Sequence, residues 1–318
     1  TCPVSASFRP GKHSWEQFVF PFWLKRHQID VLLSPGNVTP FCSPCPSVTV
    51  INDAIPFIRP ENFSFTERLT LQSLFHVSAR RSAAVLTLSE SAKRDLVRHL
   101  NIPRDKVTVF HLAAEEQFHP STSDCARVLD RHRITKPYLI CIASSRPYKN
   151  IDNLIRAFAT LKRQHQIPHQ LVITGLAGRA HNALQDLAAA LLAKEDVHFA
   201  GFVPDSDLPA LYSCAIASVY PSLYEGFGLP VLESMACGTP VISSNAASLP
   251  EVVGDAGVLF DPHNIDDMSA AIYSVISSET MRGSLREKGF QRASQFSWER
   301  SAGIILNLLI KHARPVSG

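Results

Sequence analysis

The sequence of 318 residues lacks several patterns that mark common classes of protein. No apolar run approaches the ~20 residues that a helix needs to cross a bilayer. No G-x-G-x-x-G loop follows any strand-like run, and the 13 histidines include no H-E-x-x-H spacing. Because the first pattern binds dinucleotides and the second binds zinc, neither a dehydrogenase nor a zinc protease is expected.

A strong charge of one sign is also missing. Lys and Arg number 31 against 28 Asp and Glu, so the net charge is only +3. Nucleic-acid-binding proteins usually carry a basic stripe, and we therefore expect no nucleic-acid partner. With 45% hydrophobic and 19% charged residues, the composition is that of a folded globular protein. A chain of this length predicts two domains of roughly 150 residues each.

Cysteines are few and mostly isolated. Among the seven, only Cys42 and Cys45 have the C-x-x-C spacing of metal or redox sites, and no second pair completes a zinc set. Cys141, Cys214 and Cys237 lie in apolar stretches, where we interpret them as small core residues. No Asp-x-Asp pair stands at an expected strand end either. The sequence therefore predicts no metal ion and no cofactor.

Short apolar runs alternate with helical periods, which predicts an α/β fold with doubly wound parallel sheets. In the second half the expected strands are 138–143, 171–174, 197–199, 215–220, 240–243 and 257–260. The first half has four, at 31–34, 48–52, 84–87 and 107–110. Four strands are few for a doubly wound domain and the chain begins at Thr1, so we expect the first domain to be truncated.

Domain boundaries follow from a polar, unpatterned segment at 115–136, where we place the linker. The expected units are two Rossmann-like domains, 1–120 and 121–298. Residues 299–318 are expected to form a helix that crosses back to the first domain. Rossmann-like domains bind ligands beyond the carboxyl ends of their strands, so the loops at those ends are the candidate sites.

The loop at 224–233 has the clearest chemical pattern. Gly226 and Gly228 permit a close backbone approach, and Pro230 fits the first turn of a helix. The free N–H groups of that helix start attract an anion such as a diphosphate. Glu225 precedes the turn and Glu233 lies about one turn inside the helix, so both carboxylates can face one pocket and hold neutral hydroxyl groups.

Two basic residues, Arg146 and Lys149, follow the first strand of the second half. Fixed cations at that place would stabilise the charge that grows on a departing diphosphate. Each charge-assisted hydrogen bond contributes about 1.5–3 kcal/mol. Two cations and a helix N-terminus could thus do the work of a metal ion, and Arg146, Lys149 and Glu225 are our candidate catalytic residues.

These motifs resemble glycosyltransferase family four, a large family of retaining enzymes with the GT-B fold. The segment EGFGLPVLE (225–233) has the family's E-x7-E spacing, and the likeness continues through 221–244 and 248–262. SRPYKN (145–150) is similar to the family's basic loop. In the first half, 48–57 and 85–110 look like acceptor-domain segments. Within the family, the chain looks most like mannosyltransferases of lipopolysaccharide and exopolysaccharide synthesis.

The resemblance implies a role for each matching residue. Glu225 would contact the donor sugar, Glu233 the ribose, and Arg146 with Lys149 the diphosphate. The loop at Phe202 and Val203 would read the base through its backbone. Further donor contacts are expected at Ser145, Gly175, Gly226, Phe227, Gly228 and Leu229. Gly175 has a second interpretation, because a strand-to-helix turn needs glycine anyway.

The resemblance also implies substrates. The donor would be a nucleotide sugar, GDP-mannose first, with UDP-glucose and UDP-N-acetylglucosamine as alternatives, and the acceptor a glycan or a lipid-linked glycan. Transfer would retain the configuration. The protein is expected in the cytoplasm, with contact to the inner membrane surface as an option. Residues 18–27 mix Phe20, Phe22, Trp23 and Leu24 with Lys25 and Arg26, which suits either a membrane contact or ordinary packing of an interior helix.

Two departures from the family pattern leave a second hypothesis open. Asn52 and Asp53 stand on the acceptor and sugar side, where the family usually has His-Asp. Asparagine can donate a hydrogen bond but carries no charge. The family's glycine-rich loop after the first strand is not found. A catalytically idle subunit that binds nucleotide sugars is therefore the alternative to an active transferase.

Overall fold

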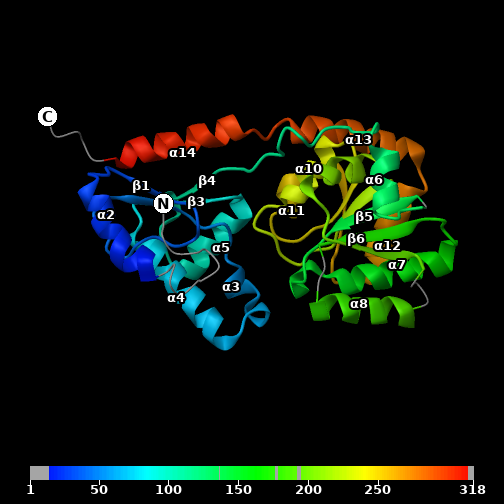
Figure 1. Ribbon diagram of the computed structural model, residues 1–318, viewed down its shortest axis with the longest axis horizontal. Coiled ribbons are helices and arrows are strands. Elements are labelled where there is room, and N and C mark those ends of the chain that lie inside the picture. Colours follow the sequence, from blue (N-terminus) through cyan, green and yellow to red (C-terminus); the bar gives the residue numbers. More distant parts are fainter. Residues whose placement is uncertain (1–13, 136, 176–177, 192–194, 314–318) are drawn as a thin grey trace. The chain divides into compact units, whose positions relative to one another are not determined.

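The computed structural model describes residues 14–135, 137–175, 178–191 and 195–313 (Figure 1). Contacts divide the chain into two compact units. The first consists of Thr1–His111 together with Trp298–Gly318, and the second of Leu112–Ser297. Each unit holds a parallel sheet with helices packed on it, which confirms the predicted α/β class with two Rossmann-like domains.

In the first unit, four parallel strands pair in the order β1-β2-β3-β4. They are β1 (Leu32–Ser34), β2 (Ser47–Val50), β3 (Ala84–Thr87) and β4 (Val107–Val109). The helical elements are η1 (Trp15–Val19), α2 (Phe20–Arg26), α3 (Ile55–Ile58), η2 (Pro60–Asn62), α4 (Phe65–Arg81), α5 (Glu90–Leu100), η3 (Arg104–Lys106) and α14 (Trp298–His312). Every residue of β2 and β3 is buried, as expected for strands covered on both faces.

Side-chain caps explain where α4 and α5 begin, and contacts with residues far away in the sequence attach α14 to the first unit. Ser64 and Glu67 form a reciprocal capping box at the start of α4. The Ser89 side chain accepts a hydrogen bond from the backbone of Ala92 at the start of α5. At the end of the chain, α14 contacts β2, and the Ser301 hydroxyl donates to the His111 carbonyl at 2.5 Å.

In the second unit, six parallel strands pair in the order β10-β9-β8-β5-β6-β7. They are β5 (Tyr138–Ile142), β6 (Gln170–Thr174), β7 (Val197–Gly201), β8 (Ala217–Tyr220), β9 (Val241–Ser244) and β10 (Gly257–Phe260). The helical elements are α6 (Cys125–Arg131), η4 (Pro147–Lys149), α7 (Ile151–His165), α8 (Gly178–Ala190), η5 (Asp205–Asp207), α9 (Leu208–Ser213), α10 (Leu229–Ala236), α11 (Leu249–Val253), α12 (Ile265–Ile276) and α13 (Glu279–Ala293). The strand order reverses between β5 and β8, and such a switch point is where open α/β sheets bind ligands.

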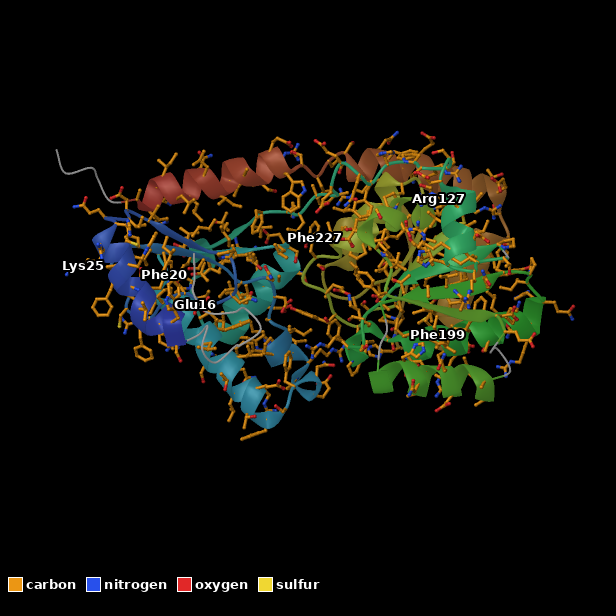
Figure 2. All side chains as sticks on the ribbon, in the orientation of Figure 1. Glu16, Phe20, Lys25, Arg127, Phe199 and Phe227 are labelled. Carbon is orange, nitrogen blue, oxygen red and sulfur yellow. A yellow bond between two sulfur atoms is a disulfide. The ribbon has the colours of Figure 1, made fainter. Side chains whose placement is uncertain are left out.

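Successive residues of β5 enter two different cores. Leu139 and Cys141 pack into one apolar cluster with α7 and α12, whereas Tyr138 and Ile140 pack into a second cluster with α9. Side chains alternate across a strand, so both faces of this sheet are filled (Figure 2). This explains why the strands of the second unit read as continuous apolar runs in the sequence.

The interpretation of 115–136 as an unstructured linker was wrong, because α6 lies within it. The buried Asp207 carboxylate receives hydrogen bonds of 2.9–3.0 Å from Arg131 Nη1 and shares a 2.9 Å contact with His132 Nε2. Cys125 forms a disulfide with Cys214, so Cys214 is not the reduced core thiol that its surroundings suggested. Polar contacts and a covalent bond hold α6, and neither produces a hydrophobic period.

The interpretation of 18–27 as an interior helix was also wrong. Leu24 is the one buried residue of η1 and α2 within the described chain, while Phe18 and Phe22 are 72% and 75% exposed. None of the helices in the described residues is both long enough and apolar enough to cross a membrane.

Candidate functional site

The loops that follow β5 and β8 meet at the switch point of the second unit. The backbone N–H of Leu223 donates to the Tyr148 carbonyl at 2.8 Å, which joins the two loops. This contact brings the predicted basic loop at 145–150 beside the loop that begins the E-x7-E segment. The sequence predicted that both loops would lie at strand ends, and the structure places them together.

Lys149 and Glu225 form an ion pair within this pair of loops. Lys149 Nζ lies 2.6 Å from Glu225 Oε1, and the two side chains are only 18% and 16% exposed. Burial by itself lowers the pKa of Lys149, but the charge and the hydrogen bond of Glu225 outweigh it and raise the pKa above its usual value. Lys149 is therefore held as a cation at the carboxyl end of the sheet.

Arg146 and Ser145 occupy a different part of the basic loop. Both are exposed, and no described residue pairs with the Arg146 guanidinium. They line a cavity of about 490 Å³ together with Asp152 and Asn153 of the first turn of α7. Lys149 and Glu225 do not line that cavity. The two predicted cations thus lie on one loop without sharing one pocket in this conformation.

The start of α10 has the backbone that the glycine pattern predicted. Gly228 adopts φ of 110°, and a Cβ added there would lie 2.8 Å from Leu249 Cδ2. Only glycine fits such a position without strain. Leu229 is the first helical residue and Pro230 follows it in the first turn. Pro230 has no N–H and the Val231 N–H donates to the Gly228 carbonyl at 2.9 Å, so the N–H of Leu229 is the one that the first turn can offer to a ligand.

Ser248 fixes the preceding turn, and its role corrects an expectation. The spacing from Ser248 to Glu251 is that of a capping box, but the Ser248 side chain makes no capping hydrogen bond to α11. Its Oγ lies 2.9 Å from the Glu225 carbonyl and 2.8 Å from the Phe227 carbonyl. Phe227 is buried and packs edge-on against Phe296, with ring centroids 5.8 Å apart.

Glu233 faces a buried pair of tyrosines. Tyr212 Oη donates to Glu233 Oε2 at 3.3 Å and lies 3.1 Å from Tyr220 Oη. Burial raises the pKa of Glu233 to about 7, and the negative charges of Glu115 and Asp205 add to this effect against the Tyr212 hydrogen bond. A carboxyl with this pKa changes its charge around neutral pH, which is unusual outside functional sites.

The loop after β7 presents one exposed and one buried apolar residue. Phe202 is 84% exposed, whereas Val203 is buried in the same apolar cluster as Tyr212. Gly175 follows β6 with φ of 75°, and a Cβ there would lie 2.2 Å from the Ala143 carbonyl oxygen. Packing against β5 is thus a sufficient reason for this glycine. Residues 176–177 of the expected turn lie outside the described residues.

Asn52 and Asp53 lie in the first unit, just beyond β2. The Asn52 backbone N–H donates to Asn37 Oδ1 at 2.9 Å. Asp53 Oδ1 accepts a hydrogen bond of 2.9 Å from the backbone of Ile55, at the start of α3. Both side chains are partly buried. The remaining predicted site residues all belong to the second unit.

Sequence reasoning missed Asn150, which follows Lys149 directly. It adopts a left-handed conformation with φ of 59° and is almost fully buried. Its Nδ2 donates to the Pro221 carbonyl at 3.0 Å and to the Pro262 carbonyl at 2.8 Å. One side chain therefore ties together the loops after β5, β8 and β10. Asparagine before a helix was the available signal, since it tolerates this backbone conformation.

The arrangement suits an anionic ligand with hydroxyl groups. The Lys149–Glu225 pair and the Leu229 N–H at the start of α10 belong to the loops after β5 and β8, and Glu233 lies within α10 itself. Among the described residues, no group of three or more His, Cys, Asp or Glu side chains is placed to hold a metal ion. Glu225 precedes α10 and Glu233 lies within it, so the segment offers two carboxylates that can accept hydrogen bonds from hydroxyl groups.

Two protein-family descriptions match almost the entire chain. "Glycosyl transferases group 1" matches residues 130–292 and "Glycosyltransferase Family 4" matches residues 2–117. The match over residues 130–292 covers most of the second unit. The match over residues 2–117 covers most of the first unit.

Two curated relatives from Escherichia coli and one solved structure show the extent of the likeness. The O-antigen chain mannosyltransferase B is 35% identical over 263 residues, which are 82% of this chain and 69% of the relative. The serotype-specific mannosyltransferase WbdA is 30% identical over 276 residues, which are 83% of this chain but only 33% of the relative. Anabaena Alr3699/HepE, solved in complex with UDP-glucose, superposes with a TM-score of 0.78 at 20% identity, covering 92% of this chain and 82% of that one. The family matches and the first of these relatives together establish that this chain is a glycosyltransferase, a member of glycosyltransferase family 4 with the GT-B fold.

Proposed function

We propose that this protein transfers mannose from GDP-mannose to a glycan or a lipid-linked glycan during polysaccharide synthesis, with retention of configuration. The two mannosyltransferases named above support the sugar and the class of product. The chain spans about one third of the length of WbdA and about 69% of the other relative. Because HepE was solved with UDP-glucose, UDP-glucose remains an alternative donor. UDP-N-acetylglucosamine, which carries the same nucleotide, is the other.

The observation that carries this proposal is the grouping of Lys149, Glu225 and the start of α10. We assign the donor diphosphate to the backbone N–H of Leu229, at the start of α10, and to Lys149. Arg146 reaches the same phosphates once its exposed side chain turns toward the Lys149 side of the loop. These cations stabilise the negative charge on the leaving diphosphate, and we expect them to do so without a metal ion.

The carboxylates have the remaining task of holding hydroxyl groups. Glu225 accepts hydrogen bonds from the donor sugar and Glu233 from the ribose, while the backbone at Phe202 and Val203 meets the base. In the transfer step the acceptor oxygen bonds to the anomeric carbon as the bond from that carbon to the phosphate oxygen breaks. The hydroxyl proton passes to the leaving phosphate oxygen on the same face of the sugar, which retains the configuration.

Asn52 favours the second candidate function, an idle subunit that binds nucleotide sugars. Its position near Asp53 is the one at which the resemblance led us to expect histidine. An amide cannot take up or carry a proton in the way that an imidazole does. Hydrolysis of the bound donor distinguishes the two functions, because an idle subunit binds the nucleotide sugar and leaves it intact.

The working location that we propose is the cytoplasm, where nucleotide sugars are available, at the inner face of the membrane. A lipid-linked acceptor would be reached there from the water side.

Calorimetric titration with GDP, UDP and ADP, each with and without magnesium, tests the donor site. We expect GDP to bind without magnesium at micromolar strength, and Lys149→Ala and Glu233→Ala to weaken binding at least tenfold. Glu287→Ala and Lys311→Ala alter exposed residues of α13 and α14 and should bind as the unaltered protein does. Binding of UDP alone would transfer the proposal to UDP sugars, and equal binding by all four variants would refute the assignment of the site.

A further inference from the structure

The loop between β8 and α10 is held in place by the segment that follows α13. Phe227 of this loop is buried, and Phe296, three residues beyond α13, is partly buried. Their rings meet edge to face, with centroids 5.8 Å apart and planes at 77°. Because Phe227 lies two residues after Glu225, this aromatic pair fixes the part of the loop that carries the first carboxylate of the site.

Arg292, in the last turn of α13, holds the Phe296 ring from its other side. Its Cζ lies 5.0 Å from the centroid of that ring. Arg292 Nε donates to the Val252 carbonyl at 2.9 Å, and Nη2 donates to the Glu251 carbonyl at 2.5 Å. Nη1 donates to Gln295 Oε1 at 2.6 Å. One planar guanidinium thus stacks on a ring and satisfies three acceptors, which an ammonium group could not do.

The two carbonyls that Arg292 holds belong to α11, and α11 also supports the loop directly. Ser248 precedes this helix, and its hydroxyl lies within 3 Å of the carbonyl oxygens of Glu225 and Phe227. The loop is therefore attached to α11 at two places. Ser248 holds its backbone, and the Phe296 ring with Arg292 holds the Phe227 side chain. These contacts form a closed ring within the second unit.

Other residues of α13 hold α10 at its far end. Arg286 Nε donates at 2.9 Å to the carbonyl of Gly238, two residues beyond α10. A Cβ added at Gly238 would lie 2.7 Å from Phe290 Cζ, so the Phe290 ring also reaches this end. Loss of the Phe296 ring should therefore loosen the loop before α10 and leave the helix where it is.

We propose that Phe296 and Arg292 are positioning residues of the donor site, which hold the loop so that Glu225 meets the sugar of a nucleotide sugar. A loosened loop should weaken binding of the nucleotide sugar more than that of the free nucleotide, because Lys149 and α10 hold the nucleotide part. This effect on the sugar rests on the proposed function; the effect on the order of the loop does not.

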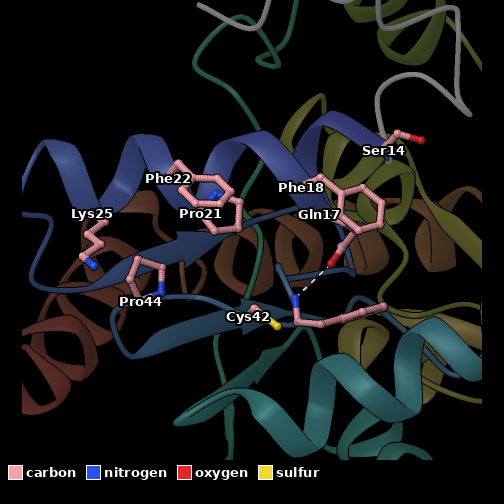
Figure 3. A pocket seen from close by; sticks show the side chains of 9 residues that line it. Ser14, Gln17, Phe18, Pro21, Phe22, Lys25, Cys42 and Pro44 are labelled. Atoms are coloured by element: carbon pink, nitrogen blue, oxygen red, sulfur yellow. Dashed lines mark hydrogen bonds between the residues drawn. The ribbon is translucent and has the colours of Figure 1, made fainter.

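Calorimetry with GDP-mannose and GDP, and with UDP-glucose and UDP as a second pair, measures this discrimination. Phe296→Ala should weaken binding of the nucleotide sugar at least tenfold and binding of the nucleotide less than twofold. Phe290→Ala removes another partly buried ring of α13 and should lower the Tm without changing the ratio of the two Kd values. Phe22→Ala, which removes a ring from α2 of the first unit (Figure 3), should change neither. Equal weakening of both ligands by Phe296→Ala would overturn the proposal.

Arg292 is tested in the same way. Arg292→Ala should lower the discrimination at least fivefold, and Arg292→Lys should not restore it, because an ammonium group cannot hold two carbonyls and a ring together. Arg286→Ala is the matched control, since Arg286 also donates from α13 to a backbone carbonyl but at the far end of α10. Unchanged discrimination in Arg292→Ala would refute the role of this residue.

A double-mutant cycle shows whether Phe296 acts through the sugar-binding carboxylate. In a chain that already carries Glu225→Ala, the further change Phe296→Ala should alter the Kd of the nucleotide sugar less than twofold. A tenfold loss that persists in this background would mean that Phe296 acts through some other group, and the proposal would fail.

Amide hydrogen exchange of the protein without ligand tests the loop by itself. Phe296→Ala should speed exchange in residues 221–228 at least fivefold and leave exchange in residues 231–237 as it is in the unaltered protein. The same exchange rates in both proteins would contradict the proposal, whichever nucleotide binds. Lys149→Ala reports on the donor site separately: if it binds GDP and UDP as the unaltered protein does, the proposed function fails and the exchange result still stands.

Discussion

The raised pKa of Glu233 predicts that donor binding depends on pH around neutrality. Ribose hydroxyls donate hydrogen bonds, so the ionised carboxylate is the better acceptor. With a pKa of about 7, about one tenth of the molecules carry the ionised carboxylate at pH 6 and about nine tenths at pH 8. Because the apparent Kd is the intrinsic Kd divided by the competent fraction, it should fall about tenfold between pH 6 and pH 8.

The assay is calorimetry with GDP-mannose, whose diphosphate has no group that titrates near pH 7. Binding at pH 6 should release close to one proton, so the measured enthalpy should vary with the ionisation enthalpy of the buffer. Glu233→Gln keeps the shape of the side chain but cannot ionise, and it should give one Kd across the whole range with no release of protons. Glu287→Gln should behave as the unaltered protein does.

A Kd that stays constant from pH 6 to pH 8 in the unaltered protein would refute this reasoning. It would mean that Glu233 does not contact the donor, or that it binds equally well in both ionisation states. A pH dependence that persists in Glu233→Gln would place the titrating group elsewhere.

Four other changes test the supports of the site. Ser248→Ala should cost about 1–2 kcal/mol of stability in urea unfolding, because the carbonyl oxygens of Glu225 and Phe227 lose their buried hydrogen-bond partner. It should also weaken binding of the nucleotide sugar several-fold in calorimetry. Asn150→Ala should cost about 2–3 kcal/mol, since two carbonyl oxygens lose their partner, whereas the exposed Asn307→Ala should change little. Reduction of the disulfide between Cys125 and Cys214 should lower the Tm. Loop closure sets an upper limit of about 4–5 kcal/mol on the stability that is lost. Cys125→Ser should make the Tm insensitive to reductant. The pKa of Glu233 is higher in the folded state than in the unfolded state, so the native state binds more protons. Its stability therefore falls as the pH rises through about 4.5 to 7. Glu233→Gln removes this loss and should raise the Tm at pH 8 more than at pH 5.

The inner strands of the second unit could be predicted because β5, β6, β8 and β9 are almost wholly buried and read as short apolar runs. The edge strands β7 and β10 are only partly buried but are still apolar enough to be recognised. β5, β6 and β10 begin and end within one residue of their expected bounds. The α6 helix was missed because an ion pair with Asp207 and a disulfide hold it in place. Contacts of this kind join residues 76 and 89 positions apart, and a local pattern carries no sign of them.

The candidate site could be predicted in its residue types but not in its pairings. Strand ends and glycines located the loops of Lys149 and Glu225 at one edge of the sheet. That the two side chains form a pair depends on a backbone contact between Leu223 and Tyr148, which the sequence does not reveal. Ser248 shows the same limit, since its spacing to Glu251 favoured a cap while its partners lie 21 and 23 residues earlier.

The Lys149–Glu225 pair connects the resting site with the proposed chemistry. Separating two buried opposite charges is costly unless each finds a new partner, because an unpaired buried charge costs several kcal/mol. In the proposed mode of binding, a nucleotide sugar would supply both partners at once: its diphosphate would pair with Lys149, and a sugar hydroxyl would donate to Glu225. A free nucleoside diphosphate supplies only the first and leaves Glu225 without a donor. We therefore expect the pair to favour the complete donor over the released nucleotide, which would help the product leave after transfer.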